Sequence, residues 1–95
     1  MGYAALDEKT IAEQLDQTAG WVRQGDRIRR VFEFRDFVEA FGFMARAALV
    51  AEKLDHHPDW KNVYSKVEVE LTTHSAKGLS EADFELARAM NGFAK

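Results

Sequence analysis

Strict alternation of apolar and polar side chains over residues 66–72 constrains the fold of this chain more than any other feature. Val67, Val69 and Leu71 are separated by acidic residues, and successive side chains of a β-strand point to opposite faces of a sheet. One face of this strand is therefore predicted to be buried and the other to meet solvent. Such a strand is typical of an antiparallel sheet that is covered on one face only.

The rest of the chain switches between helical and extended patterns. Helical spacing is found over residues 7–18, from residue 36 into the stretch 51–60, and over residues 79–93. Two hairpins are predicted between these helices, over residues 20–35 and 59–74. The order α-β-β-α-β-β-α predicts an α+β fold in which a four-stranded antiparallel sheet carries helices on one face. A chain of 95 residues has room for one such domain, residues 1–95.

The middle helix offers an apolar stripe that predicts its buried side. Phe37, Phe41, Met44 and Ala48 recur along one side of this helix. One further turn brings the same stripe to Glu52, which we expect near the buried side and close to the histidines that follow.

Composition excludes several classes of function. The chain contains no cysteine, which removes disulfides, thiolate catalysis and thiolate zinc sites, and which fits a reducing cytosol. The net charge is −3, so no overall basic field attracts nucleic acid, and the basic cluster at residues 23–30 is short and interrupted. No run approaches the roughly 18 apolar residues of a membrane span, and the N-terminal residues lack the apolar core of a signal peptide.

The chemistry is concentrated in AEKLDHHPDW, residues 51–60, which contains two of the three histidines of the chain. Histidine exchanges protons near neutral pH without a large change of its pKa. His56 and His57 precede the first strand of the second hairpin, and His74 follows its second strand. Antiparallel pairing would bring the three histidines together. Adjacent side chains of an extended segment diverge, however, so His56 and His57 are expected to have different roles.

The residues alone leave three interpretations of these histidines open. They could be loop residues without a function, or they could form a three-histidine metal site with an open position, as in catalytic zinc centres. No helical histidine spacing or H-E-x-x-H pattern supports the metal site. The pattern favours a metal-free acid/base pocket, with Glu52, Asp55 and Asp83 as candidate carboxylates that orient the histidines.

Two further residues have both a structural and a functional interpretation. SEAD, residues 80–83, is a capping-box pattern, in which Asp83 would only close the start of the last helix. Trp60 would suit the wall of a site for an aromatic ligand, and it would equally suit a half-buried strand.

Three segments together resemble the pterin-4a-carbinolamine dehydratase family: EKLDHHPDW (residues 52–60), NVYSKVEVELTTH (62–74) and GLSEADFELA (78–87). Residues 32–54 also resemble the strand and central helix of that family, and the similarity fades over the first 20 residues. The doubled histidine before proline, the tryptophan two residues later, and Thr-His before a Gly-Leu-Ser helix start form a specific combination.

The resemblance implies a reaction and a site. Members of the family remove water from a tetrahydropterin hydroxylated at carbon 4a and need no metal or cofactor. By motif position, His56 and His74 become the expected acid/base pair, and His57 is expected to hold the pterin. The carried-over site further includes Pro58, Trp60 and Asp83, with Glu52 and Asp55 beside it.

The resemblance also implies partners. A homodimer is expected, because pairing across a two-fold axis hides the edge strands of an open sheet, and some relatives form tetramers through helices. Animal members double as the dimerisation cofactor of a liver homeodomain transcription factor. The alternative function is therefore a non-catalytic scaffold that binds a transcription factor or an aromatic amino acid hydroxylase. A cytoplasmic location is expected, with a nuclear one added if the source is an animal.

Overall fold

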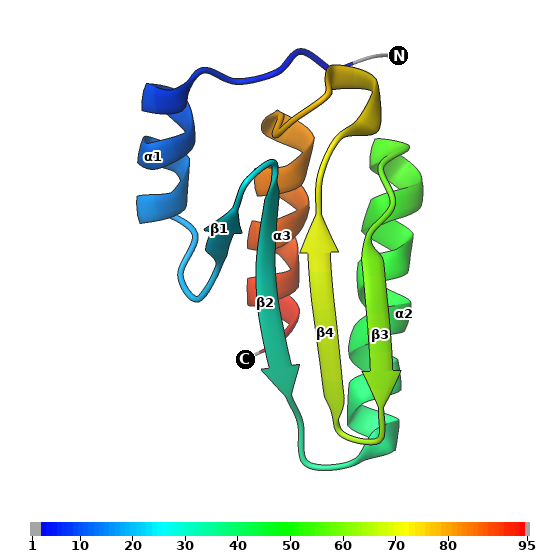
Figure 1. The fold of residues 1–95 in the computed structure, drawn as a ribbon. Coiled ribbons are helices and arrows are strands. Elements are labelled where there is room, and N and C mark those ends of the chain that lie inside the picture. The colour runs from blue at the N-terminus through cyan, green and yellow to red at the C-terminus, as the bar shows by residue number, and fades with distance from the viewer. Residues whose placement is uncertain (1–2, 95) are drawn as a thin grey trace.

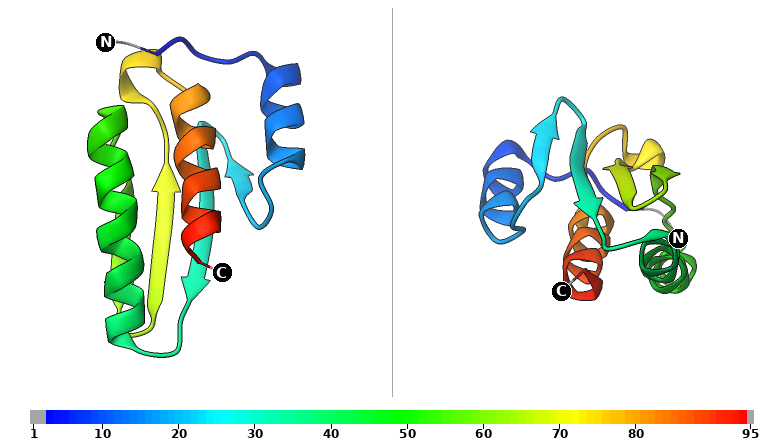
Figure 2. Two further views of the ribbon diagram at one scale, coloured as in Figure 1. Left: turned by 180° about the vertical axis from the view of Figure 1, so that it is seen from behind. Right: turned by 90° about the horizontal axis from the view of Figure 1, so that it is seen from below.

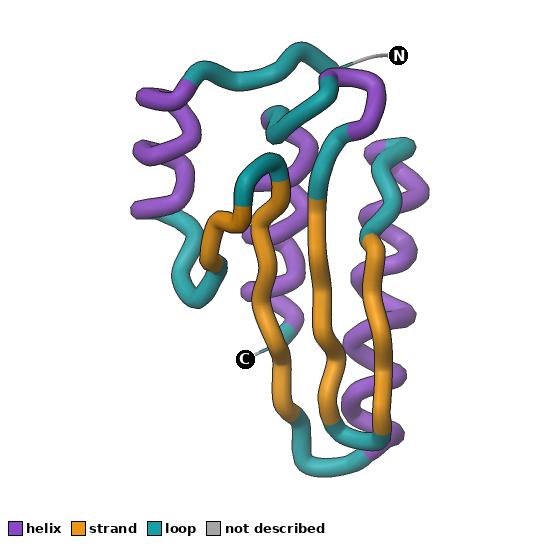
Figure 3. The backbone as a smooth tube through the Cα atoms, viewed as in Figure 1, coloured by secondary structure: helices purple, strands orange, loops and turns teal. Residues whose placement is uncertain are grey.

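The computed structural model of this chain describes residues 3–94. These residues form the predicted order of helices and strands, with one 3₁₀ turn added before the last helix (Figure 1; Figure 3). The helices are α1 (Glu8–Asp16), α2 (Phe37–Leu54) and α3 (Glu81–Phe93), and the 3₁₀ turn is η1 (His74–Ala76). The strands are β1 (Val22–Gln24), β2 (Arg27–Glu33), β3 (Asp59–Val63) and β4 (Lys66–Leu71).

The four strands form one antiparallel sheet in the order β1-β2-β4-β3. Gln24 pairs with Arg27, so the first hairpin turns at Gly25-Asp26 as predicted. Both α2 and α3 lie on the same face of the sheet, whereas α1 lies beside the short strand β1 (Figure 2). The α+β prediction is therefore confirmed.

The alternation in β4 determines which face of the sheet is covered. Val67, Val69 and Leu71 are fully buried, whereas Glu68 and Glu70 are partly exposed on the opposite face. The predicted stripe of α3 packs on this face and completes the core by burying Phe84, Ala87 and Met90. No helix within residues 3–94 is both long enough and apolar enough to cross a membrane.

The prediction for the buried side of α2 is wrong. The helix instead buries the following residues: Ala40, Phe43, Ala47 and Ala51. Phe37 and Phe41 are 48% and 58% exposed, and Glu52 is correspondingly exposed rather than near the core. Apolar residues occur on both sides of α2, so spacing alone could not choose between them. The structure packs the side with three alanines, where Phe43 contacts Phe32 at 4.7 Å between ring centroids.

Three chain segments meet at one end of the sheet, where the site described below is formed. Asp59, at the start of β3, pairs with Glu70, near the end of β4. The hairpin turn before β2 lies at this end too, because the Thr72 hydroxyl donates a hydrogen bond to the backbone oxygen of Asp26 at 2.6 Å. Asp55, in the left-handed conformation with φ of 52°, ends α2 and lets the chain reverse toward β3.

Candidate active site

A polar cleft opens where β2 and β3 begin and β4 ends. One hollow, of about 310 Å³, is lined by Arg27, His57, Pro58, Asp59, Glu70, Thr72 and His74. A second hollow of about 290 Å³ shares Arg27, Thr72 and His74 with it and extends toward Lys77. Two imidazoles contributed by segments far apart in the sequence therefore lie along one cleft.

His57 is held at the exposed side of this cleft. Its Nε2 atom lies 2.6 Å from Oε1 of Glu52, in the last turn of α2. The two side chains are 57% and 77% exposed. His74 is also exposed and begins the 3₁₀ turn η1, directly after the buried Thr73.

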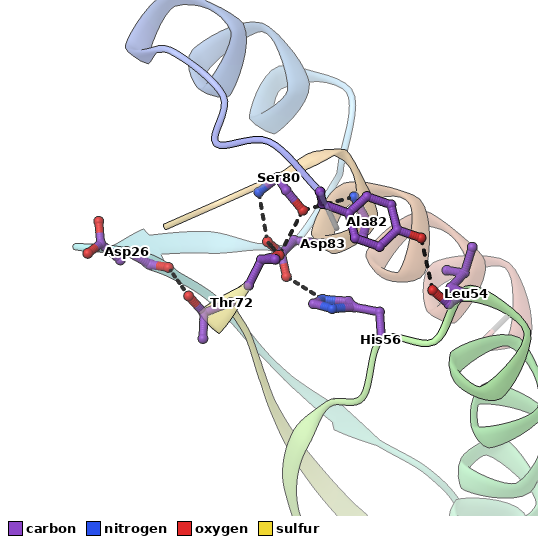
Figure 4. A network of polar contacts seen from close by, with 9 residues as sticks. Asp26, Leu54, His56, Thr72, Ser80, Ala82 and Asp83 are labelled. Atoms are coloured by element: carbon purple, nitrogen blue, oxygen red, sulfur yellow. Dashed lines mark hydrogen bonds and ion pairs between the residues drawn. The ribbon is translucent and has the colours of Figure 1, made fainter. Parts of the chain in front are cut away.

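His56 has different surroundings. It is only 7% exposed, and its Nε2 atom lies 2.6 Å from Oδ1 of the fully buried Asp83 (Figure 4). The other oxygen of Asp83 accepts hydrogen bonds from the Thr73 hydroxyl at 2.7 Å and from the backbone N–H of Ser80 at 2.9 Å. Ser80 thus completes the predicted capping box, and Asp83 bonds the histidine in addition to closing the helix start.

The structure brings some of the predicted site residues together and separates others. His57, Pro58 and His74 line the cleft. His56, which was expected to share the cleft, lines neither hollow, because its ring is buried against Asp83.

The other predicted residues do not line the cleft themselves. Trp60 pairs with the buried Val69 and packs against the core. Asp55 is exposed at the helix end, and Glu52 reaches the cleft through its contact with His57.

Several residues of the site were missed at the sequence level. Arg27 contacts Glu70 at 2.9 Å and Asp59 at 3.3 Å, so an ion-paired cluster forms one wall of the cleft. The alternation of β4 already places Glu70 on the open face and could have identified it. Tyr3 had no such signal. Its hydroxyl donates to the backbone oxygen of Leu54 at 2.9 Å, and its ring meets His56 edge-on at 6.2 Å.

The chemistry of the cleft is that of imidazoles, carboxylates and hydroxyls. Within the described part of the chain, residues 3–94, no three histidine or acidic side chains gather so that they could ligate one metal ion. The arrangement offers two imidazoles for proton exchange beside a hollow large enough for a small heterocycle.

Fold and site together define a small α+β protein with a histidine-lined cleft at the end of an antiparallel sheet. The sequence model of the family described as Pterin 4 alpha carbinolamine dehydratase matches residues 4–93. The chain therefore belongs to this family, as the resemblance predicted.

Bacterial relatives are similar over nearly the whole chain. A protein of Nitrobacter hamburgensis named "Putative pterin-4-alpha-carbinolamine dehydratase" is 62% identical over 92 residues, which cover 95% of this chain and 91% of the relative. A Chelativorans protein with the same name is 53% identical over 96 residues, covering 99% of this chain and 98% of the relative.

A solved structure shares the fold. The crystal structure of a transcriptional coactivator/pterin dehydratase from Brucella melitensis superimposes with a TM-score of 0.91 at 50% sequence identity. The match covers 96% of this chain and 99% of that one.

Proposed function

We propose that this dehydratase removes water from a tetrahydropterin hydroxylated at carbon 4a and releases quinonoid dihydropterin. The product would return to the cofactor pool of aromatic amino acid hydroxylases. Family membership over residues 4–93 and the dehydratase names of the relatives support the reaction. The observation that carries the proposal is the meeting of His57 and His74 along one cleft.

The reaction requires two proton transfers. An acid protonates the departing hydroxyl as the bond between carbon 4a and oxygen breaks, and a base accepts a proton from a ring nitrogen. We assign these roles to His57 and His74. The pair carried over from the family motif was His56 and His74, but Nε2 of His56 is engaged by Asp83 in a buried contact. His56 therefore supports the site in this proposal, and His57 takes its place in proton transfer.

Glu52 suggests which histidine is the acid. A carboxylate accepts hydrogen bonds, so the 2.6 Å contact calls for a proton on Nε2 of His57. When Nδ1 also carries a proton, His57 can donate that proton to the leaving hydroxyl and remain oriented by Glu52. His74 is then the base. Pro58 forms the wall against which the pterin lies, and Asp55, which ends α2, lets the chain turn into that wall.

A dehydration assay tests the proposal directly. The substrate is generated in situ by an aromatic amino acid hydroxylase, and quinonoid dihydropterin is followed by absorbance. The wild type should exceed the spontaneous rate, and His74→Ala should lose about 100-fold in turnover, as expected for removal of an acid/base group. Circular dichroism of the variant checks that it is folded. If the folded wild type gives no acceleration, the dehydration proposal is overturned.

A second role as a scaffold has a separate basis. The outer side of α2 leaves Phe37, Val38, Phe41 and Leu49 between 48% and 78% exposed. We propose that this apolar side binds another protein chain, either in a homodimer or homotetramer or with a hydroxylase or transcription factor. The coactivator name of the Brucella melitensis protein supports such a role. A cytoplasmic location and a single domain over residues 1–95 complete the proposal.

A further inference from the structure

A buried network of hydroxyl and carboxyl groups connects the two cleft histidines. The residues of this network are His56, Thr73, Ser80 and Asp83, and each is at most 7% exposed. His56 directly precedes His57, and Thr73 directly precedes His74. One carboxylate, that of Asp83, therefore bonds both residues that lead into the cleft.

The direction of the hydrogen bonds in this network follows from counting donors. A threonine or serine hydroxyl has one proton to donate. The Thr73 hydroxyl donates to Asp83, so the 2.7 Å contact between the Thr73 and Ser80 hydroxyls must have Ser80 as its donor. The Ser80 oxygen in turn accepts from the backbone N–H of Ala82 at 3.3 Å. Every hydroxyl proton in the network has an acceptor.

The backbone of Thr73 is also fixed by hydrogen bonds. Its N–H donates to the oxygen of Gly78 at 3.1 Å, and its own oxygen accepts from Ala76 at 3.1 Å, which closes the turn containing His74. The same turn is joined to the N-terminus of α3 by the Thr73 hydroxyl. The N-terminal segment adds a further tie, because Leu6 donates to the oxygen of Leu79 at 2.9 Å.

We propose that Thr73 and Ser80 are positioning residues of the dehydration: their buried hydroxyls, acting through Asp83, hold His74 in register with His57 across the cleft. The inference rests on the proposed dehydration. Neither hydroxyl lies where the family resemblance placed a catalytic or substrate-binding group. Displacement of a reacting group by about 1 Å can cost about 100-fold in rate, so a hydroxyl that never contacts the substrate can still control turnover.

Thr73→Val and Thr73→Ser form the matched test, because valine keeps the shape of the side chain and serine keeps its hydroxyl. Thr73→Val should lower kcat about 10-fold with KM within about twofold of the wild type, since it disturbs geometry rather than binding. Thr73→Ser should retain nearly full turnover. Thermal unfolding identifies any loss of folded protein, which a purely structural role would show without a change in kcat.

A double-mutant cycle with His74 makes the test specific. If Thr73 acts through His74, Thr73→Val should cause no further loss of turnover in the His74→Ala background. Wild-type turnover in folded Thr73→Val, or the same fractional loss in both backgrounds, would overturn the inference.

Variants of Ser80 give an equivalent test if Thr73→Val does not fold. Ser80→Ala should then lose turnover in a way that Ser80→Thr restores, and unchanged turnover in Ser80→Ala would refute the positioning role. Failure of the dehydration proposal is visible separately, because it appears as an inactive wild type before any variant is made.

Discussion

Two consecutive histidines of this chain each contact a carboxylate at the same distance. His56 and Asp83 approach to 2.6 Å, as do His57 and Glu52. The first pair has side chains 8% and 0% exposed, the second 57% and 77%. Burial therefore separates two contacts that distance alone would treat as equal. The inner pair holds two segments of the chain together, and the outer pair is open to solvent, as the proposed proton transfer requires.

The inner pair should be the costlier one to break. Asp83→Ala leaves the His56 ring, the Thr73 hydroxyl and the Ser80 N–H without their buried acceptor. We expect a loss of about 3–5 kcal/mol in the free energy of unfolding, measured by urea denaturation. Glu81→Ala is the matched control, because Glu81 is an exposed carboxylate in the same turn of α3, and it should cost no more than about 1 kcal/mol. Equal losses in the two variants would contradict the distinction.

The outer pair should matter for turnover instead. His57→Ala is expected to lower kcat about 100-fold, because it removes an acid/base group from the cleft. The midpoint of thermal unfolding should move by only a few degrees, within about 4 °C. His56→Ala should instead affect stability more than turnover, with a clear fall in the unfolding midpoint. A large fall in the unfolding midpoint of His57→Ala would show that the outer histidine is structural as well.

The sequence predicted that the two neighbouring histidines would have different surroundings, but not which of them would be buried. Alternation in β4 predicted the covered face. Antiparallel pairing predicted that all three histidines would come together, whereas the cleft is lined by His57 and His74 only. Divergence of adjacent side chains predicted that the two neighbouring histidines would differ. Which of them faces inward depends on Asp83, which is distant in sequence and lies on another helix.

The remaining differences have physical causes of the same kind. The buried side of α2 was predicted wrongly because that helix is apolar on two sides, and only the shape of the sheet selects the alanines beside Phe43. Arg27 belongs to no motif, and its role depends on a cross-strand neighbour, Glu70. Tyr3 reaches His56 through a tertiary contact that no local pattern indicates.

Glu52→Gln separates orientation from charge in the outer pair. The variant keeps an acceptor oxygen near His57 but removes the negative charge. Because both side chains are exposed, the free energy of unfolding should change by less than about 1 kcal/mol. Turnover should fall less than in His57→Ala, and the substitution should have no added effect in the His57→Ala background. A full additional loss there would mean that Glu52 acts on the substrate independently of His57.

The smallest effect on stability is expected for an ion pair that contains no histidine, the pair of Arg23 and Glu8. Arg23 donates hydrogen bonds to Glu8 at 2.7 and 3.0 Å, and these bonds lower the pKa of Glu8 from its ordinary value of 4.5. A lowered pKa in the folded state contributes stability that is present above pH 4.5 and is lost as the pH falls through the folded-state pKa. Thermal unfolding of wild type and Glu8→Gln should therefore show a slightly higher midpoint for the wild type at pH 7. That difference should disappear as the pH falls through the folded-state pKa of Glu8, because Glu8 is then neutral like glutamine while Arg23 keeps its charge. A difference that persists in acid would mean that this exposed pair is held by packing rather than by charge.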